Sequence, residues 1–132
     1  MYEFHGWIRL AESPSEIDEG ELDSKCKKLQ HLFSNINWSS GKAELLLLNG
    51  GYTVVLNGIP NRRRNEAEEL SQIIDYIIKN FKGAYGLVYE YDEQTQTAAG
   101  HGVFSVKVIK RGRYDLGLDP FLSPLIPVVE DP

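Results

Sequence analysis

The histidines are the residues of this chain best suited to acid–base or metal chemistry, because the imidazole group titrates near neutral pH. They are His5, His31 and His101. None of them stands in a spacing typical of a metal site or a catalytic motif, and the glycine-rich turns lack the lysine of a phosphate loop. The sequence therefore predicts no catalytic residue, no bound metal and no cofactor.

A run of carboxylates with no basic residue among them is a second candidate for chemistry. Its six members are Glu12, Glu16, Asp18, Glu19, Glu21 and Asp23, called the acidic segment below. One or two carboxylates satisfy the dipole at a helix N-terminus, so this segment carries an excess of negative charge. Such an excess accelerates the encounter with a basic partner. The acidic segment is therefore either the solvated start of a helix or a surface that docks a positively charged protein, and the second is the functional prediction.

The first strand of the chain offers a different kind of surface. Residues 2–10 alternate with a period of two, which puts Phe4 and Ile8 on a core face and His5 and Trp7 on the opposite face. The stretch 85–91 alternates in the same way. The two patterns predict a shared, exposed aromatic sheet face that carries His5, Trp7, Tyr85, Tyr89 and Tyr91. Such a face is either covered in part by the proline-rich C-terminal residues 119–130 or used to hold a partner. Aromatic residues are enriched where proteins meet partners, so this face is a secondary candidate for binding.

Two helices and two hairpins are expected to position these residues. Apolar residues at intervals of three and four predict one helix that starts at Ser13-Pro14-Ser15-Glu16, is interrupted near Gly20 and ends near Asn35. The same spacing predicts a second helix that starts near Asn65. The Asn49-Gly50-Gly51 sequence predicts a tight turn between strands at 45–48 and 52–56. Strands at 85–91 and 103–109 form the second hairpin.

The resulting order, β-α-β-β-α-β-β, predicts an α+β fold. We expect a two-layer sandwich in which an antiparallel or mixed sheet carries both helices on one face. Residues 1–132 form a single domain of ordinary size. The proline-rich C-terminal tail is expected to lie extended across the body, anchored by Phe121, Leu122, Leu125 and Ile126.

Composition limits the classes of partner. The net charge of -5 argues against a nucleic-acid partner. Arg62-Arg63-Arg64 is a local exception and an alternative docking site, but Glu66 and Glu68 follow it closely. The longest apolar run, Leu45 to Leu48, is too short to cross a membrane, and the start of the chain does not resemble a secretory signal. A single cysteine, Cys26, fits a reducing compartment, so we predict a cytoplasmic protein.

Four short segments spread along the chain carry a family resemblance. They are Tyr2-Glu3-Phe4-His5-Gly6-Trp7, Ala84-Tyr85-Gly86-Leu87-Val88-Tyr89-Glu90, Lys110-Arg111-Gly112 and Asp119-Pro120-Phe121-Leu122-Ser123-Pro124-Leu125-Ile126-Pro127. Together they resemble the seventh named immunity-protein family of bacterial polymorphic-toxin and contact-dependent inhibition systems. The motifs are non-catalytic, and none of them identifies a residue that contacts a toxin.

This resemblance implies an antitoxin that binds the C-terminal toxin domain of a cognate effector. An acidic inhibitor suits a basic nuclease, because charge complementarity speeds association. We expect a monomer that forms a one-to-one toxin complex and has no catalytic activity. The alternative from the residues themselves is a small enzyme or ligand-binding domain that uses the aromatic face around His5, Trp7 and Tyr89.

Overall fold

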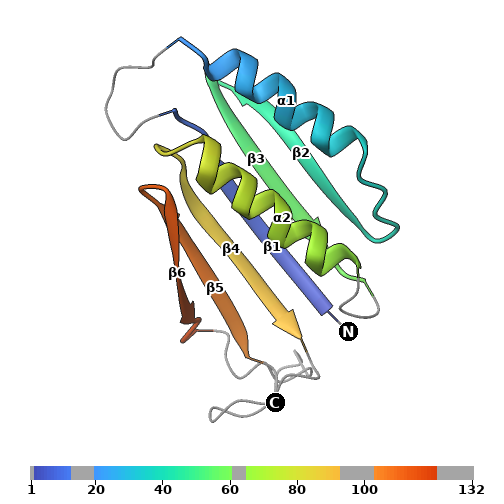
Figure 1. The fold of residues 1–132 in the computed structure, drawn as a ribbon. Coiled ribbons are helices and arrows are strands. Elements are labelled where there is room, and N and C mark those ends of the chain that lie inside the picture. The colour runs from blue at the N-terminus through green and yellow to red at the C-terminus, as the bar shows by residue number, and fades with distance from the viewer. Residues whose placement is uncertain (1, 13–19, 61–64, 93–102, 122–132) are drawn as a thin grey trace.

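The computed structural model describes residues 2–12, 20–60, 65–92 and 103–121. These residues form one sheet with two helices packed on the same face (Figure 1). The elements in chain order are β1 (Tyr2–Arg9), α1 (Leu22–Ser34), β2 (Gly41–Leu48), β3 (Gly51–Gly58), α2 (Asn65–Asn80), β4 (Tyr85–Asp92), β5 (Phe104–Lys110) and β6 (Arg113–Leu118). The α+β prediction is confirmed.

The six strands are ordered β2-β3-β1-β4-β5-β6, and every neighbouring pair is antiparallel. Each helix connects two strands that point the same way and are separated by one other strand. α1 links β1 to β2 across β3, and α2 links β3 to β4 across β1. The first crossover starts from β1 and moves toward the β2 edge of the sheet, whereas the second starts from β3 and moves toward the β6 edge. The two starting strands, β1 and β3, are antiparallel to each other. A common right-handed connection therefore puts both helices on the same face of the sheet.

The core lies between this helical layer and the sheet. Each helix turns one apolar stripe toward the strands, as its three- and four-residue spacing requires. The buried residues of the two stripes are Cys26, Leu29 and Phe33 in α1 and Ala67, Leu70, Ile73, Ile74 and Ile77 in α2. They pack against the alternate residues of the central strands, among them Phe4, Ile8, Val54 and Val88.

Phe4 is a central core residue of β1 that packs against the connection between α1 and β2. Its side chain is fully buried, and its ring centroid lies 5.2 Å from that of Trp38, with the rings near perpendicular at 74°. Gly58, opposite Phe4 in β3, leaves the space that this ring fills, because a Cβ atom there would collide with the ring. The aromatic residue and the glycine are therefore matched across two strands.

The hairpin turns explain one difference from the sequence-based order. Asn49 and Gly50 have φ angles of 49° and 79°, the positive pair of a tight two-residue turn, so the predicted first hairpin is confirmed. Arg111 and Gly112 repeat this conformation with φ angles of 51° and 72°. They connect β5 to β6, a strand that the sequence-based order lacked.

The start of α1 and the C-terminal tail are the remaining predictions about the fold. α1 begins at Leu22, just after Gly20, whose φ of 87° interrupts helical geometry, and its C-cap is Asn35. The predicted start at Ser13 lies outside the described residues, as do Arg62 to Arg64 and the tail residues 122–132. Phe121 is 91% exposed, so its prediction as a buried anchor is wrong. It follows the sheet edge, where the helices do not cover it.

Candidate functional site

Glu12 does not belong to the surface that the acidic segment was expected to form. Its side chain is only 4% exposed. The chain after β1 folds against the end of α2, where the Glu12 carbonyl accepts a hydrogen bond from the Lys82 backbone N–H at 3.1 Å. The Ala11 carbonyl accepts one from Gly83 at the same distance. The prediction of Glu12 as a docking residue is therefore wrong, because the backbone pairing draws it inward.

Glu21 and Asp23 are the exposed members of the acidic segment among the described residues. Glu21 lies 3.8 Å from the ammonium group of Lys25, an exposed pair of little strength. Asp23 accepts a hydrogen bond of 2.8 Å from the hydroxyl of Tyr52 in β3. Glu16, Asp18 and Glu19 lie outside the described residues. The start of α1 thus presents at least two carboxylates to solvent.

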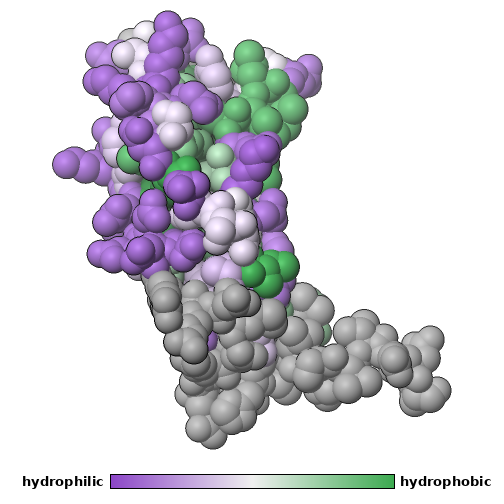
Figure 2. All heavy atoms as spheres, turned by 90° about the vertical axis from the view of Figure 1, so that its right-hand side faces the viewer, coloured by the Kyte–Doolittle hydropathy of each residue, from purple (hydrophilic) through white to green (hydrophobic). Residues whose placement is uncertain are grey.

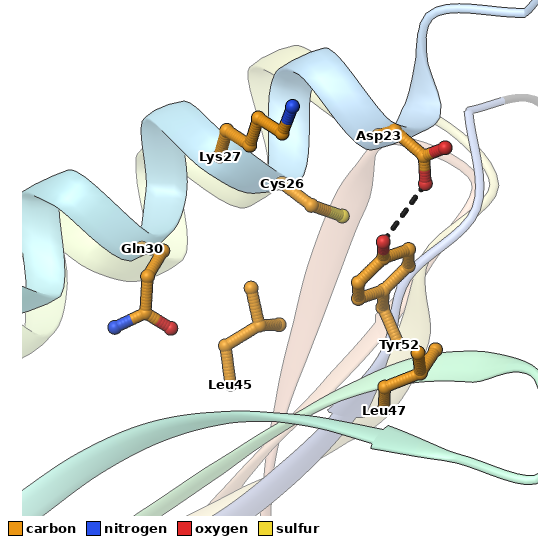
Figure 3. Close-up of a pocket in the computed structure, with 7 residues that line it drawn as sticks. All are labelled: Asp23, Cys26, Lys27, Gln30, Leu45, Leu47 and Tyr52. Carbon is orange, nitrogen blue, oxygen red and sulfur yellow. Dashed lines mark hydrogen bonds between the residues drawn. The ribbon is translucent and has the colours of Figure 1, made fainter.

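A small pocket opens beside these carboxylates, between α1 and the β2–β3 hairpin. Its volume is about 220 Å³, and Figure 3 shows Cys26 and the leucines Leu45 and Leu47 facing it, with the Asp23–Tyr52 hydrogen bond at one side. This hydrogen bond to the Asp23 carboxylate raises the pKa of Tyr52, because it stabilises the protonated hydroxyl. A mostly apolar hollow next to a carboxylate fits a protruding side chain of a partner.

The thiol in this pocket is not a reactive group. Burial raises the pKa of Cys26 to about 11, and the negative charges of Asp23 and Glu12 add to the effect. The thiolate is the form that attacks electrophiles and binds metals, and it is scarce at neutral pH when the pKa is so high. Cys26 therefore serves as a small apolar side chain.

On the opposite face of the sheet, His5 is held by two oxygen acceptors. Its Nε2 lies 2.5 Å from a Glu3 carboxylate oxygen, and its Nδ1 lies 2.8 Å from the Asn57 side-chain oxygen. Burial of the ring lowers its pKa, but the hydrogen bonds to Glu3 and Asn57 and the Glu3 charge outweigh this and raise the pKa above its ordinary value. Both nitrogens are occupied, so the ring offers none of them to a substrate.

The raised pKa predicts a pH-dependent contribution of His5 to stability. The folded state binds the proton more tightly than the unfolded state, so the stabilisation is complete below the unfolded pKa of about 6.5 and is lost as pH rises through the folded pKa. We expect His5→Gln to lower the unfolding free energy more at about pH 5 than at about pH 8. Urea denaturation at the two pH values measures this. An equal loss at both would show that His5 takes up no proton on folding.

The predicted aromatic face is present around Trp7. The registers align Val55, Trp7, Leu87 and Val108 in one row across four strands, on the face away from the helices. Trp7 is 44% exposed and Tyr85 is 52% exposed, with their ring centroids 6.1 Å apart and the planes at 88°. The structure thus brings an apolar row and two exposed aromatic rings together.

Tyr89 and Tyr91 complete the predicted set, with different outcomes. Tyr89 pairs with His5 in the β1–β4 register and is half-buried. Tyr91 is only 8% exposed, and its ring lies 5.2 Å from that of Phe104 in the neighbouring strand β5. Tyr91 is therefore a packing residue, and its prediction as a surface residue is wrong.

A polar cluster on the helical side was missed from the sequence. Glu90 accepts a hydrogen bond of 2.6 Å from the Tyr2 hydroxyl, and its other carboxylate oxygen lies 3.3 Å from the ammonium group of Lys107. The same ammonium group lies 5.2 Å from the centre of the Tyr114 ring. The polar residues Glu90 and Lys107 at inward positions of β4 and β5 were the available signal. The cluster ties β1, β4, β5 and β6 together.

Comparison with known proteins relates this chain to one protein family by its sequence. The family model for immunity protein 7 matches residues 1–131, which is almost the whole chain. The chain belongs to the immunity protein 7 family. No curated protein and no solved structure matches it. Membership in this family implies a toxin as partner, so the exposed surfaces of this immunity protein are the features of interest.

The described residues of this immunity protein contain neither a candidate metal site nor a helix that could span a membrane. In the part of the chain that the structure describes, no three or more side chains of His, Cys, Asp or Glu gather as a metal site would require. Within the same residues, no helix has the length and apolar character needed to span a membrane.

The side of the immunity protein formed by α1 and β2 carries both charged or polar residues and exposed apolar residues. Figure 2 shows hydrophilic residues over much of this side and a group of hydrophobic residues toward one end. The large exposed apolar residues of β2 are Leu47, at 62% exposure, and Leu48, at 51%. Because Leu47 also lines the pocket beside Asp23, apolar and acidic groups adjoin here.

Proposed function

We propose that this immunity protein binds the C-terminal toxin domain of a cognate effector and blocks it in a one-to-one complex in the cytoplasm. The observation that carries the proposal is the family match over residues 1–131. The toxin is a basic nuclease, since the net charge of -5 favours association with a positively charged domain.

Protection is by binding and not by turnover. Two features of the described residues support this: both ring nitrogens of His5 are engaged by Glu3 and Asn57, and the Cys26 thiol has a pKa of about 11. Neither group is available as a base or nucleophile at neutral pH.

The toxin docks on the rest of the acidic segment, whose members are Glu16, Asp18, Glu19, Glu21 and Asp23. Of these, Glu21 and Asp23 lie at the start of α1. The exposure of Glu21 and Asp23 supports this placement, as does the apolar pocket beside Asp23. Carboxylates would steer the encounter, and the pocket with Leu47 would supply desolvated contact after docking.

Co-expression with the toxin domain encoded next to this protein tests the proposal. We expect the immunity protein to restore growth and to co-purify with the toxin in equal amounts. His5→Ala and His101→Ala variants are expected to protect as well as the unaltered protein. If either variant lost protection while still forming the complex, protection would depend on chemistry, and the binding mechanism would be refuted.

A further inference from the structure

The outer edge of the sheet at β6 is unusually apolar for an exposed strand. Tyr114, Leu116 and Leu118 are 41%, 66% and 53% exposed. They lie on the helical side, since Leu116 pairs with Lys107, whose ammonium group reaches Glu90 and the Tyr114 ring on that side. In Figure 1, α1 lies over β2 and β3 and α2 lies over the centre of the sheet, so neither helix covers β6.

The backbone of the same three residues points away from the sheet. Arg111 and Gly112 form a two-residue turn, so Lys110 and Arg113 are its hydrogen-bonded closing pair. Every second residue of β6, counted from Arg113, therefore directs its backbone N–H and C=O groups toward β5. The 2.9 Å hydrogen bond from the Asp119 N–H to the Phe104 carbonyl falls in this series. Tyr114, Leu116 and Leu118 therefore direct their N–H and C=O groups to an edge that no other described strand pairs with.

We infer that a second copy of this chain occupies this edge, with the two β6 strands antiparallel about a two-fold axis at Leu116. In this register Tyr114 lies opposite Leu118 of the other copy, and Leu116 lies opposite its own counterpart. All outward backbone groups of the three residues are then paired, in about six hydrogen bonds. Apolar side chains oppose apolar side chains along the whole contact, so the strand is its own complement.

Charge and hydrogen bonding select this register over its neighbours. With the axis at Leu116, Asp115 lies opposite the uncharged Gly117. Moving the axis to Asp115 would place two copies of that aspartate face to face, and moving it to Gly117 would place Tyr114 opposite Pro120, which has no N–H to donate. Like charges directly opposite each other destabilise paired strands. The chosen register opposes none.

The dimer is compatible with toxin binding and replaces the monomer expected from the sequence. The β6 edge and the hairpin that lines the pocket beside Asp23 are at opposite sides of the sheet (Figure 1). Each copy would therefore keep its acidic segment for one toxin. The inference does not depend on the proposed function, because it concerns the protein without any toxin.

Sedimentation of the purified protein over a range of concentrations tests the dimer. We expect the average mass to rise with concentration from that of one chain toward that of two. Leu116→Lys and Leu116→Glu should each raise the midpoint concentration, at which half of the chains are dimeric, by at least about tenfold. Because residue 116 faces itself across the axis, an equal mixture of the two variants should recover a dimer through opposite charges. Urea midpoints equal to that of the unaltered protein, measured at concentrations where all three are monomeric, would show that both variants fold, since residue 116 is exposed.

Leu47→Lys is the matched control, because Leu47 is 62% exposed on the opposite edge strand β2. It should leave the midpoint concentration unchanged. A protein that stays monomeric up to about 1 mM would overturn the inference, as would dimerisation that resists both Leu116 variants, a mixture that stays monomeric, or a loss of the dimer in the Leu47→Lys control.

Discussion

Reversing Asp18, Glu19 and Glu21 to lysine is expected to slow association with the toxin by about tenfold or more at low ionic strength. Long-range attraction between the acidic segment and a basic toxin accelerates the encounter, so removing it acts on the association rate. Glu21 is exposed, and its side-chain pair with Lys25 is weak, so its reversal should not disturb the described part of the fold. Stopped-flow measurement over a range of salt concentrations should also give a flatter salt dependence in the variant.

The control carries the same change of net charge on another surface. Glu66, Glu68 and Asp75 lie on α2, and their reversal to lysine should slow association less than the reversal in the acidic segment. Equal rates for the two triple variants would refute the acidic segment as the docking site. The aromatic face would then be the surface to test, through Trp7→Ala and Tyr85→Ala.

Replacing Phe4 by alanine should lower the unfolding free energy by about 3–5 kcal/mol. Phe4 is fully buried between Trp38 and Gly58, so the truncation removes apolar contacts on both sides and leaves a cavity in the central strand. The measurement is chemical denaturation at fixed pH. Both the midpoint and the extrapolated free energy should fall.

Phe121→Ala is the matched control, because it deletes the same side chain at a position that is 91% exposed. Its effect should stay within about 0.5 kcal/mol. A comparable loss in the two variants would mean that Phe121 is a buried anchor in solution, contrary to the structure. A small loss in Phe4→Ala would place the core elsewhere.

The parts of the fold that follow from local patterns could be predicted from the sequence. The apolar stripe of α2 and the Asn49-Gly50 turn are examples, because period and turn chemistry are properties of neighbouring residues. β6 was missed since Arg111 is a rare residue for positive φ, although Gly112 and the alternation after it carried a signal.

Burial set by distant parts of the chain could not be predicted. Glu12 looked like one more exposed carboxylate, but its side chain is buried where its backbone bonds to Lys82, far along the sequence. Likewise, the period of two put Tyr91 on the correct face, but packing against Phe104 from the next strand removes it from the surface. Periodicity assigns a residue to a face and gives no information about what covers that face.

Titration of the purified toxin domain with this immunity protein tests the central claim most directly. The quantity measured is the rate at which a fixed amount of toxin cleaves nucleic acid, at toxin concentrations well above the dissociation constant. We predict that the rate falls linearly and reaches zero at one chain per toxin. A toxin that stays active beside an excess of the protein, or one silenced by a small fraction of an equivalent, would contradict inhibition by one-to-one binding.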